Sequence, residues 1–137
     1  MDAYLGYNQI PMYPGDKDHS SFITDQGLYC YKVMLFGLKN ARATYQRLVN
    51  MMFEALIDKT MEVYVDDMLV KSESVIDHVS DLGGMFKVLR NYQMKLNLLK
   101  CVFRVSFEIF LGFMVNNRGI EANPEKIRAL LDMRSLV

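Results

Sequence analysis

The sequence has few cysteines, no net charge and no long apolar run. Only two cysteines occur among its 137 residues, Cys30 and Cys101, and neither belongs to a CxxC or Cys/His cluster. This usage argues against structural zinc and a disulfide framework, and it favours a reducing intracellular setting. No apolar run approaches the roughly 20 residues that a membrane-spanning helix needs, and no basic-then-apolar signal opens the chain.

The charge balance excludes a second class of protein. The sequence has 16 Lys and Arg and 16 Asp and Glu, which gives a formal net charge of zero, and the basic residues are spread along the chain. Stand-alone nucleic-acid binders are usually basic, so this balance argues against independent tight binding. A Walker-type phosphate loop, an Asn-x-Ser/Thr site and an internal repeat are also missing. The length and the 51% hydrophobic content fit one soluble globular domain with one core.

The apolar periodicity predicts an α+β fold. Amphipathic helices are expected over residues 41–57 and 75–92, and Asn123-Pro124-Glu125 is a helix start with cap, proline and acid in order. Before the second helix, the segment Ser74 to Asp77 resembles a capping box, and the apolar stripe of that helix is expected at Val75, Val79, Leu82, Phe86 and Leu89. Short apolar runs predict strands over residues 21–24, 28–34, 94–98 and 109–115, and a hairpin over 61–71. Because neighbouring strands pair through hairpins, we expect an antiparallel sheet with helices packed on one face.

Two adjacent carboxylates lie at the centre of that hairpin, in Tyr64-Val65-Asp66-Asp67-Met68. Asp tolerates the left-handed conformations of tight turns, so a two-residue Asp66-Asp67 loop is expected between the strands. Paired carboxylates repel each other unless a hard cation such as Mg²⁺ lies between them and their partners. By itself, the pentapeptide fits a solvated turn better than a metal site.

Five sequence blocks around this hairpin share the order and spacing of one known family. They are Asp2-x-x-x-Gly6-Tyr7, then Phe36-Gly37-Leu38-Lys39-Asn40-Ala41 with Thr44-Tyr45-Gln46, then Tyr64-Val65-Asp66-Asp67, then Met94-Lys95-Leu96-Asn97 with Lys100-Cys101, and Phe110-Leu111-Gly112-Phe113. On these blocks the chain resembles the palm region of a reverse transcriptase from gypsy-class LTR retrotransposon polyproteins, notably those of plants.

The resemblance implies an incomplete polymerase palm, ferredoxin-like in fold. Residues 1–119 would form a partial palm without its fingers, and residues 120–137 would begin a truncated connection or thumb segment. The missing fingers, thumb, RNase H and integrase would belong to the same Pol polyprotein. The expected location is intracellular, in a cytoplasmic virus-like particle or the nucleus, without secretion or membrane insertion.

The implied activity is RNA-directed DNA polymerisation with two Mg²⁺ (or Mn²⁺) ions as cofactors. Asp2, Asp66 and Asp67 would be the catalytic and metal-binding residues, although Asp2 lies far from the pair in sequence. The partners would be an RNA template, a DNA primer and a dNTP. The implied nucleotide-binding residues are Tyr7, Phe36, Gly37 and Lys100. The implied template- and primer-binding residues are Gln46, Tyr64, Phe110, Leu111 and Gly112. A core tyrosine, a solvated lysine or glutamine and an ordinary buried strand are the plainer explanations of these positions.

Several positions depart from the family's pattern, among them Leu35, Arg42 and Leu98. Together they suggest drift, which keeps a second hypothesis open: a catalytically inactive remnant of a decayed retroelement. A third hypothesis is a small nucleic-acid-binding module without catalysis. The strands lack the clustered basic and aromatic residues of RNA-recognition sheets, which argues against the third.

Overall fold

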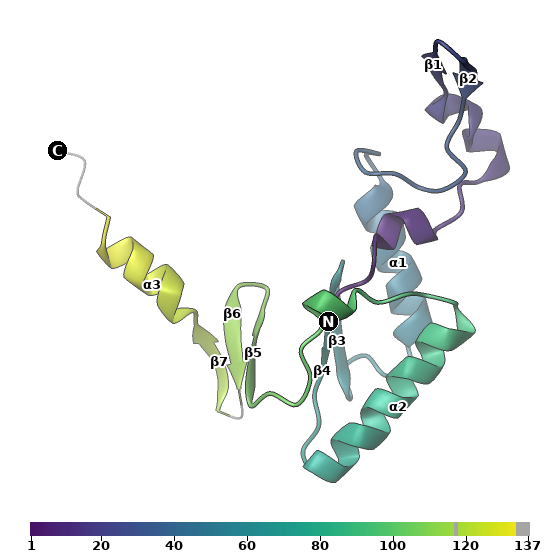
Figure 1. The fold of residues 1–137 in the computed structure, drawn as a ribbon. Helices are drawn as coiled ribbons and strands as arrows, with labels where there is room; N and C mark the ends of the chain where they lie inside the picture. Colours follow the sequence, from purple (N-terminus) through teal and green to yellow (C-terminus); the bar gives the residue numbers. More distant parts are fainter. Residues whose placement is uncertain (117, 134–137) are drawn as a thin grey trace. The chain divides into compact units, whose positions relative to one another are not determined.

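The structure, a computed structural model, describes residues 1–116 and 118–133. Contacts divide the chain into two compact units, Met1–Cys101 and Val102–Val137, and each is described by itself. Within the described residues, seven strands form three small antiparallel sheets, accompanied by three α-helices (Figure 1). The predicted α+β class and antiparallel pairing are confirmed, with the strands spread over three sheets instead of one. The division predicted at residues 119 and 120 concerns polymerase domains and stays a prediction.

The first unit is built on two helices and one hairpin. Helix α1 (Ala41–Phe53) and helix α2 (Val75–Asn91) contact each other, and the hairpin of β3 (Met61–Tyr64) and β4 (Asp67–Val70) lies against them. Figure 1 shows both helices to one side of this hairpin. The core is the apolar set that these elements share. Its fully buried side chains include Tyr45, Val49, Phe53, Met61, Met68 and Met85.

Helix α1 begins where the sequence predicts and ends earlier. Asn40 is its N-cap residue, although the Asn40 side chain makes no capping hydrogen bond. The helix stops at Phe53, before the predicted Ile57. The Leu56 N–H bonds to the Phe53 carbonyl three residues back, as in a tightened final turn, and Asp58 then has a positive φ of 65°. Residues 54–60 then lead into β3.

Helix α2 has the predicted cap but a shorter apolar face. The Ser74 hydroxyl accepts a hydrogen bond from the Asp77 N–H (3.1 Å), as its capping pattern predicts. The predicted apolar stripe is wrong at its start, since Val75 and Val79 are exposed. Apolar packing begins at Leu82 and continues through Met85 and Leu89, because only this part of the helix meets the core.

The N-terminal segment crosses the end of this hairpin before leaving it. Asp2 pairs with Asp67, and Ala3 pairs with Leu96, as isolated antiparallel bridges. The predicted 94–98 strand is reduced to that bridge and is followed by η4 (Leu98–Lys100). Three further 3-10 turns come early in the chain: η1 (Gly6–Gln9), η2 (Pro14–Asp16) and η3 (Asp18–Ser20). A short hairpin of β1 (Phe22–Thr24) and β2 (Gly27–Tyr29) follows, and β2 is shorter than predicted.

The second unit is a three-stranded meander followed by a helix. Its elements are β5 (Phe107–Phe110), β6 (Phe113–Asn116), β7 (Gly119–Ala122) and α3 (Pro124–Leu131). The single strand predicted over residues 109–115 is wrong, because a tight turn at Leu111-Gly112 splits it into β5 and β6. Both turn residues have positive φ (52° and 81°), as in the turns that suit two-residue hairpins. The predicted cap of α3 is confirmed, since the Asn123 side chain accepts from the Glu125 N–H.

No helix within residues 1–116 and 118–133 is long and apolar enough to span a membrane.

Candidate functional site

The turn of the β3–β4 hairpin is centred on Val65 and Asp66. The register pairs Tyr64 with Asp67, so the predicted Asp66-Asp67 loop is wrong by one residue. Val65 has a φ of 51°, in the left-handed region that a β-branched side chain seldom adopts. The two carboxylates are therefore not equivalent: Asp66 lies in a strained turn, and Asp67 begins β4.

Gln46 of α1 holds this turn in place. Its Oε1 atom accepts a hydrogen bond from the Val65 N–H at 2.5 Å, and its Nε2 atom donates to Asn50 Oδ1 at 2.7 Å. The Val65 side chain is buried beneath the turn. A side-chain acceptor and apolar burial thus offset the unfavourable φ of Val65. The predicted contact of Gln46 with a template stays a prediction.

Gln46→Met is expected to lower the free energy of unfolding by about 1–3 kcal/mol. Methionine keeps the length of the side chain but leaves the Val65 N–H without its acceptor. Urea titration measures the change, and Asn50→Ala is the matched control. Asn50 bonds to Gln46 one helical turn away and is exposed. Equal losses in the two variants would show that the turn does not depend on Gln46.

Asp2 is brought beside the hairpin carboxylates by main-chain contacts. Asp2 pairs with Asp67, the Met68 N–H donates to the Met1 carbonyl (2.9 Å), and the Asn97 N–H donates to the Asp2 carbonyl (2.9 Å). The structure therefore gathers the three predicted catalytic aspartates, which the chain separates. They are not a ready-made metal cage: across residues 1–116 and 118–133, no three Asp, Glu, His or Cys side chains converge tightly enough to hold an ion.

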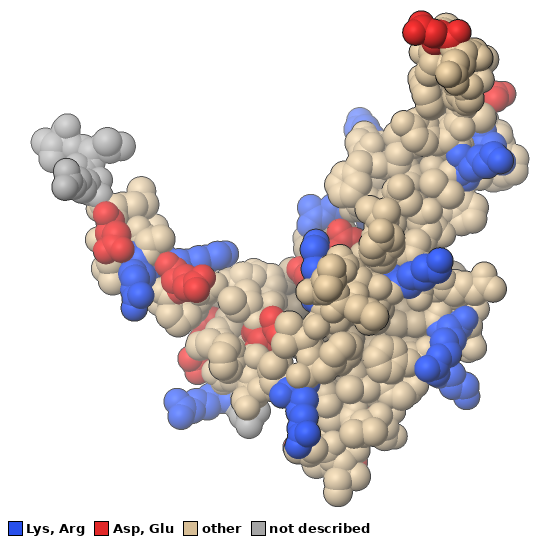
Figure 2. Space-filling model, in the orientation of Figure 1, with Lys and Arg blue, Asp and Glu red and all other residues tan. Residues whose placement is uncertain are grey.

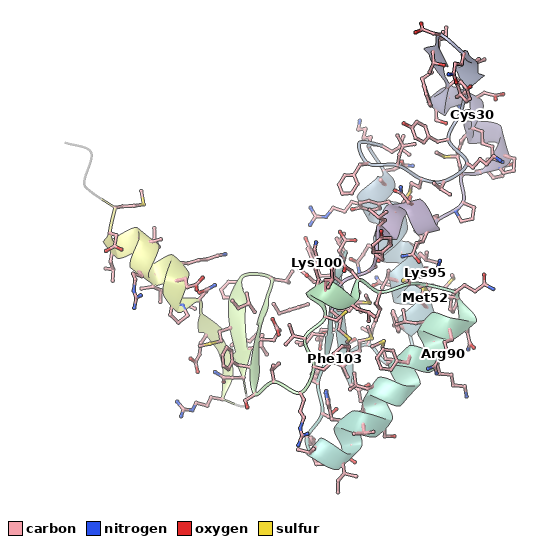
Figure 3. The ribbon with its side chains drawn as sticks, in the orientation of Figure 1. Cys30, Met52, Arg90, Lys95, Lys100 and Phe103 are labelled. Atoms are coloured by element: carbon pink, nitrogen blue, oxygen red, sulfur yellow. The ribbon has the colours of Figure 1, made fainter. Side chains whose placement is uncertain are left out.

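Two cations neutralise part of the negative charge here. Lys100 of η4, labelled in Figure 3, forms an ion pair with Asp2, with 3.1 Å between Nζ and Oδ2. Burial, followed by the charges of Asp2 and Asp67, raises the pKa of the Asp66 carboxyl above its ordinary value, while Lys100 and Arg42 oppose that rise. Asp66 is thus the carboxylate whose ionisation the fold opposes. A cation near it would relieve that cost.

Asp66→Asn is expected to raise the melting temperature at pH 7 when no divalent cation is present. Because the folded-state pKa of Asp66 is raised, the stability that this carboxyl contributes is complete below its unfolded pKa. That stability is lost as the pH rises through the higher folded pKa. Thermal unfolding from pH 7 downward should show the advantage of the variant shrinking as the pH falls through the raised folded-state pKa, with no further change below the ordinary pKa of 3.8. A difference in melting temperature between the variant and the wild type that stays constant with pH would contradict a raised pKa of Asp66.

Aromatic side chains border the carboxylates. Tyr7 is buried in η1 and packs edge-on against Phe36 (ring centroids 4.9 Å apart) and Tyr45 (5.3 Å). Burial and the Asp66 charge raise the pKa of the Tyr7 hydroxyl. Phe36 is 76% exposed, and Gly37 beside it has a φ of 94°. The predicted nucleotide-binding residues Tyr7, Phe36 and Lys100 therefore lie around the same carboxylates.

Tyr45 borders the carboxylates, although the sequence indicated it only as part of the second sequence block and of the apolar face of α1. Its side chain is fully buried, and its hydroxyl has no hydrogen-bond partner among the described residues. Burial raises the pKa of this hydroxyl, and the charges of Asp66 and Asp2 raise it further. The one sequence signal for such a role was the choice of tyrosine at a helix position that faces the core, where phenylalanine would fill nearly the same space without a hydroxyl.

The remaining predicted residues are divided between the two units. Tyr64 ends β3 and is 46% exposed beside the carboxylate turn. Phe110, Leu111 and Gly112 lie in the second unit, at the β5–β6 turn. Their predicted primer contact stays a prediction.

The chain is similar to known reverse transcriptases in sequence. A family model described as reverse transcriptase (RNA-dependent DNA polymerase) matches residues 1–135. The Pol polyprotein from transposon 297 of Drosophila melanogaster is 37% identical over 131 residues, which are 96% of this chain and 12% of that protein. The polyprotein from transposon gypsy of the same species is 33% identical over 95% of the chain and 13% of its own length.

Solved structures give the same fold. The foamy viral protease-reverse transcriptase in complex with an RNA/DNA hybrid matches 98% of this chain and 18% of its own, with a TM-score of 0.85 and 22% identity. The same viral protein in complex with double-stranded DNA also has a TM-score of 0.85, at 21% identity. The chain thus spans about an eighth of the curated relatives it matches.

Proposed function

Because the chain belongs to the reverse transcriptase (RNA-dependent DNA polymerase) family, we propose that its carboxylate site supports RNA-directed DNA synthesis within a retrotransposon Pol polyprotein. The observation that carries the proposal is the meeting of Asp2 with Asp66 and Asp67, through the Asp2–Asp67 bridge at the end of the hairpin. In this palm, an RNA template, a DNA primer and a dNTP would be the partners. The plant affinity of the element stays a prediction.

The donor set fits Mg²⁺ or Mn²⁺. Three carboxylates supply the hard oxygen ligands that these ions prefer. Burial, followed by repulsion from Asp2 and Asp67, raises the pKa of Asp66, and a bound cation would offset both effects. Asp2, Asp66 and Asp67 would hold two such ions, which activate the primer 3′-hydroxyl and neutralise the triphosphate. In this structure the Asp2 carboxylate is paired with Lys100, and the three carboxylates do not converge. To hold the ions, their side chains would have to rotate toward a common point.

The chain's own residues would orient the reactants. Gln46 fixes the turn that carries Asp66, and the edge-on packing of Tyr7 with Phe36 offers an aromatic wall to an incoming nucleotide. Lys100 is within reach of Asp2 and could donate a proton to a departing phosphate oxygen. Figure 2 shows basic side chains scattered over the visible face without a continuous basic patch, consistent with a need for further Pol segments to grip nucleic acid.

Primer extension on poly(rA)/oligo(dT) tests this function. The chain, and a longer Pol polyprotein that carries it, are incubated with dTTP and Mg²⁺ or Mn²⁺, beside a chelated control. Incorporation that the chelator abolishes is expected in at least the longer protein. Absence of incorporation from both proteins would favour the inactive remnant, and incorporation that persists under chelation would exclude a metal role.

A further inference from the structure

Arg42 is held beside the carboxylates by Tyr64. It is exposed in the first turn of α1, and its Nη2 atom donates a hydrogen bond to the Tyr64 hydroxyl at 3.1 Å. Its Cζ atom lies 5.2 Å from the centroid of the Tyr64 ring. A cation in the first turn of a helix opposes the helix dipole, so the helix itself does not favour this residue. The Tyr64 contacts orient the guanidinium toward the end of the β3–β4 hairpin.

The charge of Arg42 reaches the site without being neutralised there. This charge opposes the rise in the pKa of both Asp66 and Tyr7, so it acts on the carboxylate turn and on the tyrosine that packs against Phe36. Among residues 1–116 and 118–133, the ion pairs are Lys71–Glu62 and Lys100–Asp2, so Arg42 has no carboxylate at ion-pair distance. A guanidinium carries several N–H donors, and the Tyr64 hydroxyl accepts from only one of its nitrogens.

An oriented guanidinium with spare donors fits phosphate oxygens. Its planar fork binds them in pairs, and arginine is preferred over lysine where such geometry matters. Tyr64, which contacts the guanidinium, exposes aromatic surface on which nucleobases can stack. An exposed Arg–Tyr contact adds only about 0.5–1 kcal/mol to stability, so the fold depends little on this pair and the guanidinium stays available to a ligand.

We propose that Arg42, oriented by Tyr64, binds a phosphate group at the carboxylate site. The inference rests on the proposed function and names a residue that departs from the family's pattern. The phosphate belongs either to the primer–template backbone or to the nucleotide triphosphate, and these sources are separable by experiment. On this account, Arg42 supplies one of the basic contacts that the neutral chain otherwise lacks.

Arg42→Ala is compared with Arg47→Ala, an exposed arginine of the same helix that makes no contact with Tyr64. Fluorescence anisotropy measures the dissociation constant for poly(rA)/oligo(dT) at several salt concentrations, in the full chain and in the longer polyprotein. We expect about tenfold weaker binding in Arg42→Ala, with a salt slope reduced by about one. If the phosphate is that of the nucleotide, the KM for dTTP rises about tenfold and duplex binding is unchanged.

Two further variants separate a ligand contact from a folding defect. Arg42→Lys keeps the charge but loses the fork, and Tyr64→Phe removes only the hydroxyl that holds Arg42. Both should give smaller losses in the same measurement, with melting temperatures matching the wild type. Unchanged or tighter binding of both duplex and dTTP in Arg42→Ala would overturn the inference while leaving the proposed function intact. A wild-type polyprotein that binds no duplex would overturn both.

Discussion

Asp66→Asn is expected to reduce Mg²⁺-dependent nucleotide incorporation by about 100-fold or more. Asparagine has nearly the shape of aspartate, so the Val65-Asp66 turn and its bond to Gln46 are kept. What is lost is one full negative charge at the carboxylate whose ionisation the fold already opposes. The measurement is steady-state incorporation of dTTP on poly(rA)/oligo(dT).

Asp58→Asn is the matched control for that experiment. Asp58 is exposed before β3, and its φ of 65° is one that asparagine also tolerates. Its incorporation rate should equal that of the wild type. A rate for Asp66→Asn within a few-fold of this control would contradict a role for Asp66 in holding the ion.

Phe53→Ala is expected to lower the free energy of unfolding by about 3–5 kcal/mol. Phe53 is fully buried at the end of α1, within the core shared with β3 and α2. The cavity would open in this core, near the end of α1 that leads toward β3. Because small domains are stabilised by only about 5–15 kcal/mol, this variant should unfold at markedly lower urea concentration.

Met51→Ala is the matched control for Phe53→Ala. It also places an alanine in α1 but removes no buried side chain, so it separates the loss of core packing from a change in helix propensity. Met51 lies in the same helix and is 57% exposed. Its loss should change stability by less than about 0.5 kcal/mol. Similar midpoints for Phe53→Ala and Met51→Ala would mean that the first unit is not organised around this core.

The sequence was sufficient to locate the hairpin but not to centre its turn. A turn at Asp66-Asp67 and one at Val65-Asp66 both keep Met61, Val63, Met68 and Val70 on one face, so alternation alone cannot choose. Local propensity favours two aspartates over a β-branched residue with positive φ. The choice is made by contacts from distant segments, namely Gln46 of α1 and the bridge from Asp2.

A similar limit explains the strand predicted over residues 109–115. Its apolar run is continuous, and Gly112 was the only sign of the turn that divides it. Helix caps were predicted better, because a cap depends on neighbours within a few residues. Ser74 and Asn123 make the bonds that their patterns predict.

The carboxylate site also combines a local feature, which the sequence indicates, with contacts between distant segments, which it does not. The pair Asp66 and Asp67 was visible in the sequence, whereas no periodicity or spacing connects them to Asp2. That connection came from the family resemblance, and the structure supplies its physical basis in the Asp2–Asp67 bridge. The roles of Gln46 and Arg42 depend on side-chain contacts across the fold, which a single sequence does not reveal.

Thermal unfolding in millimolar Mg²⁺ tests most directly whether the three aspartates form a cation site. An ion that binds only the folded state raises the melting temperature with its concentration. The wild-type chain should therefore gain stability in Mg²⁺, while Asp66→Asn, the more stable of the two without the ion at pH 7, should gain little. Equal gains in both proteins, or no gain in either, would contradict the account.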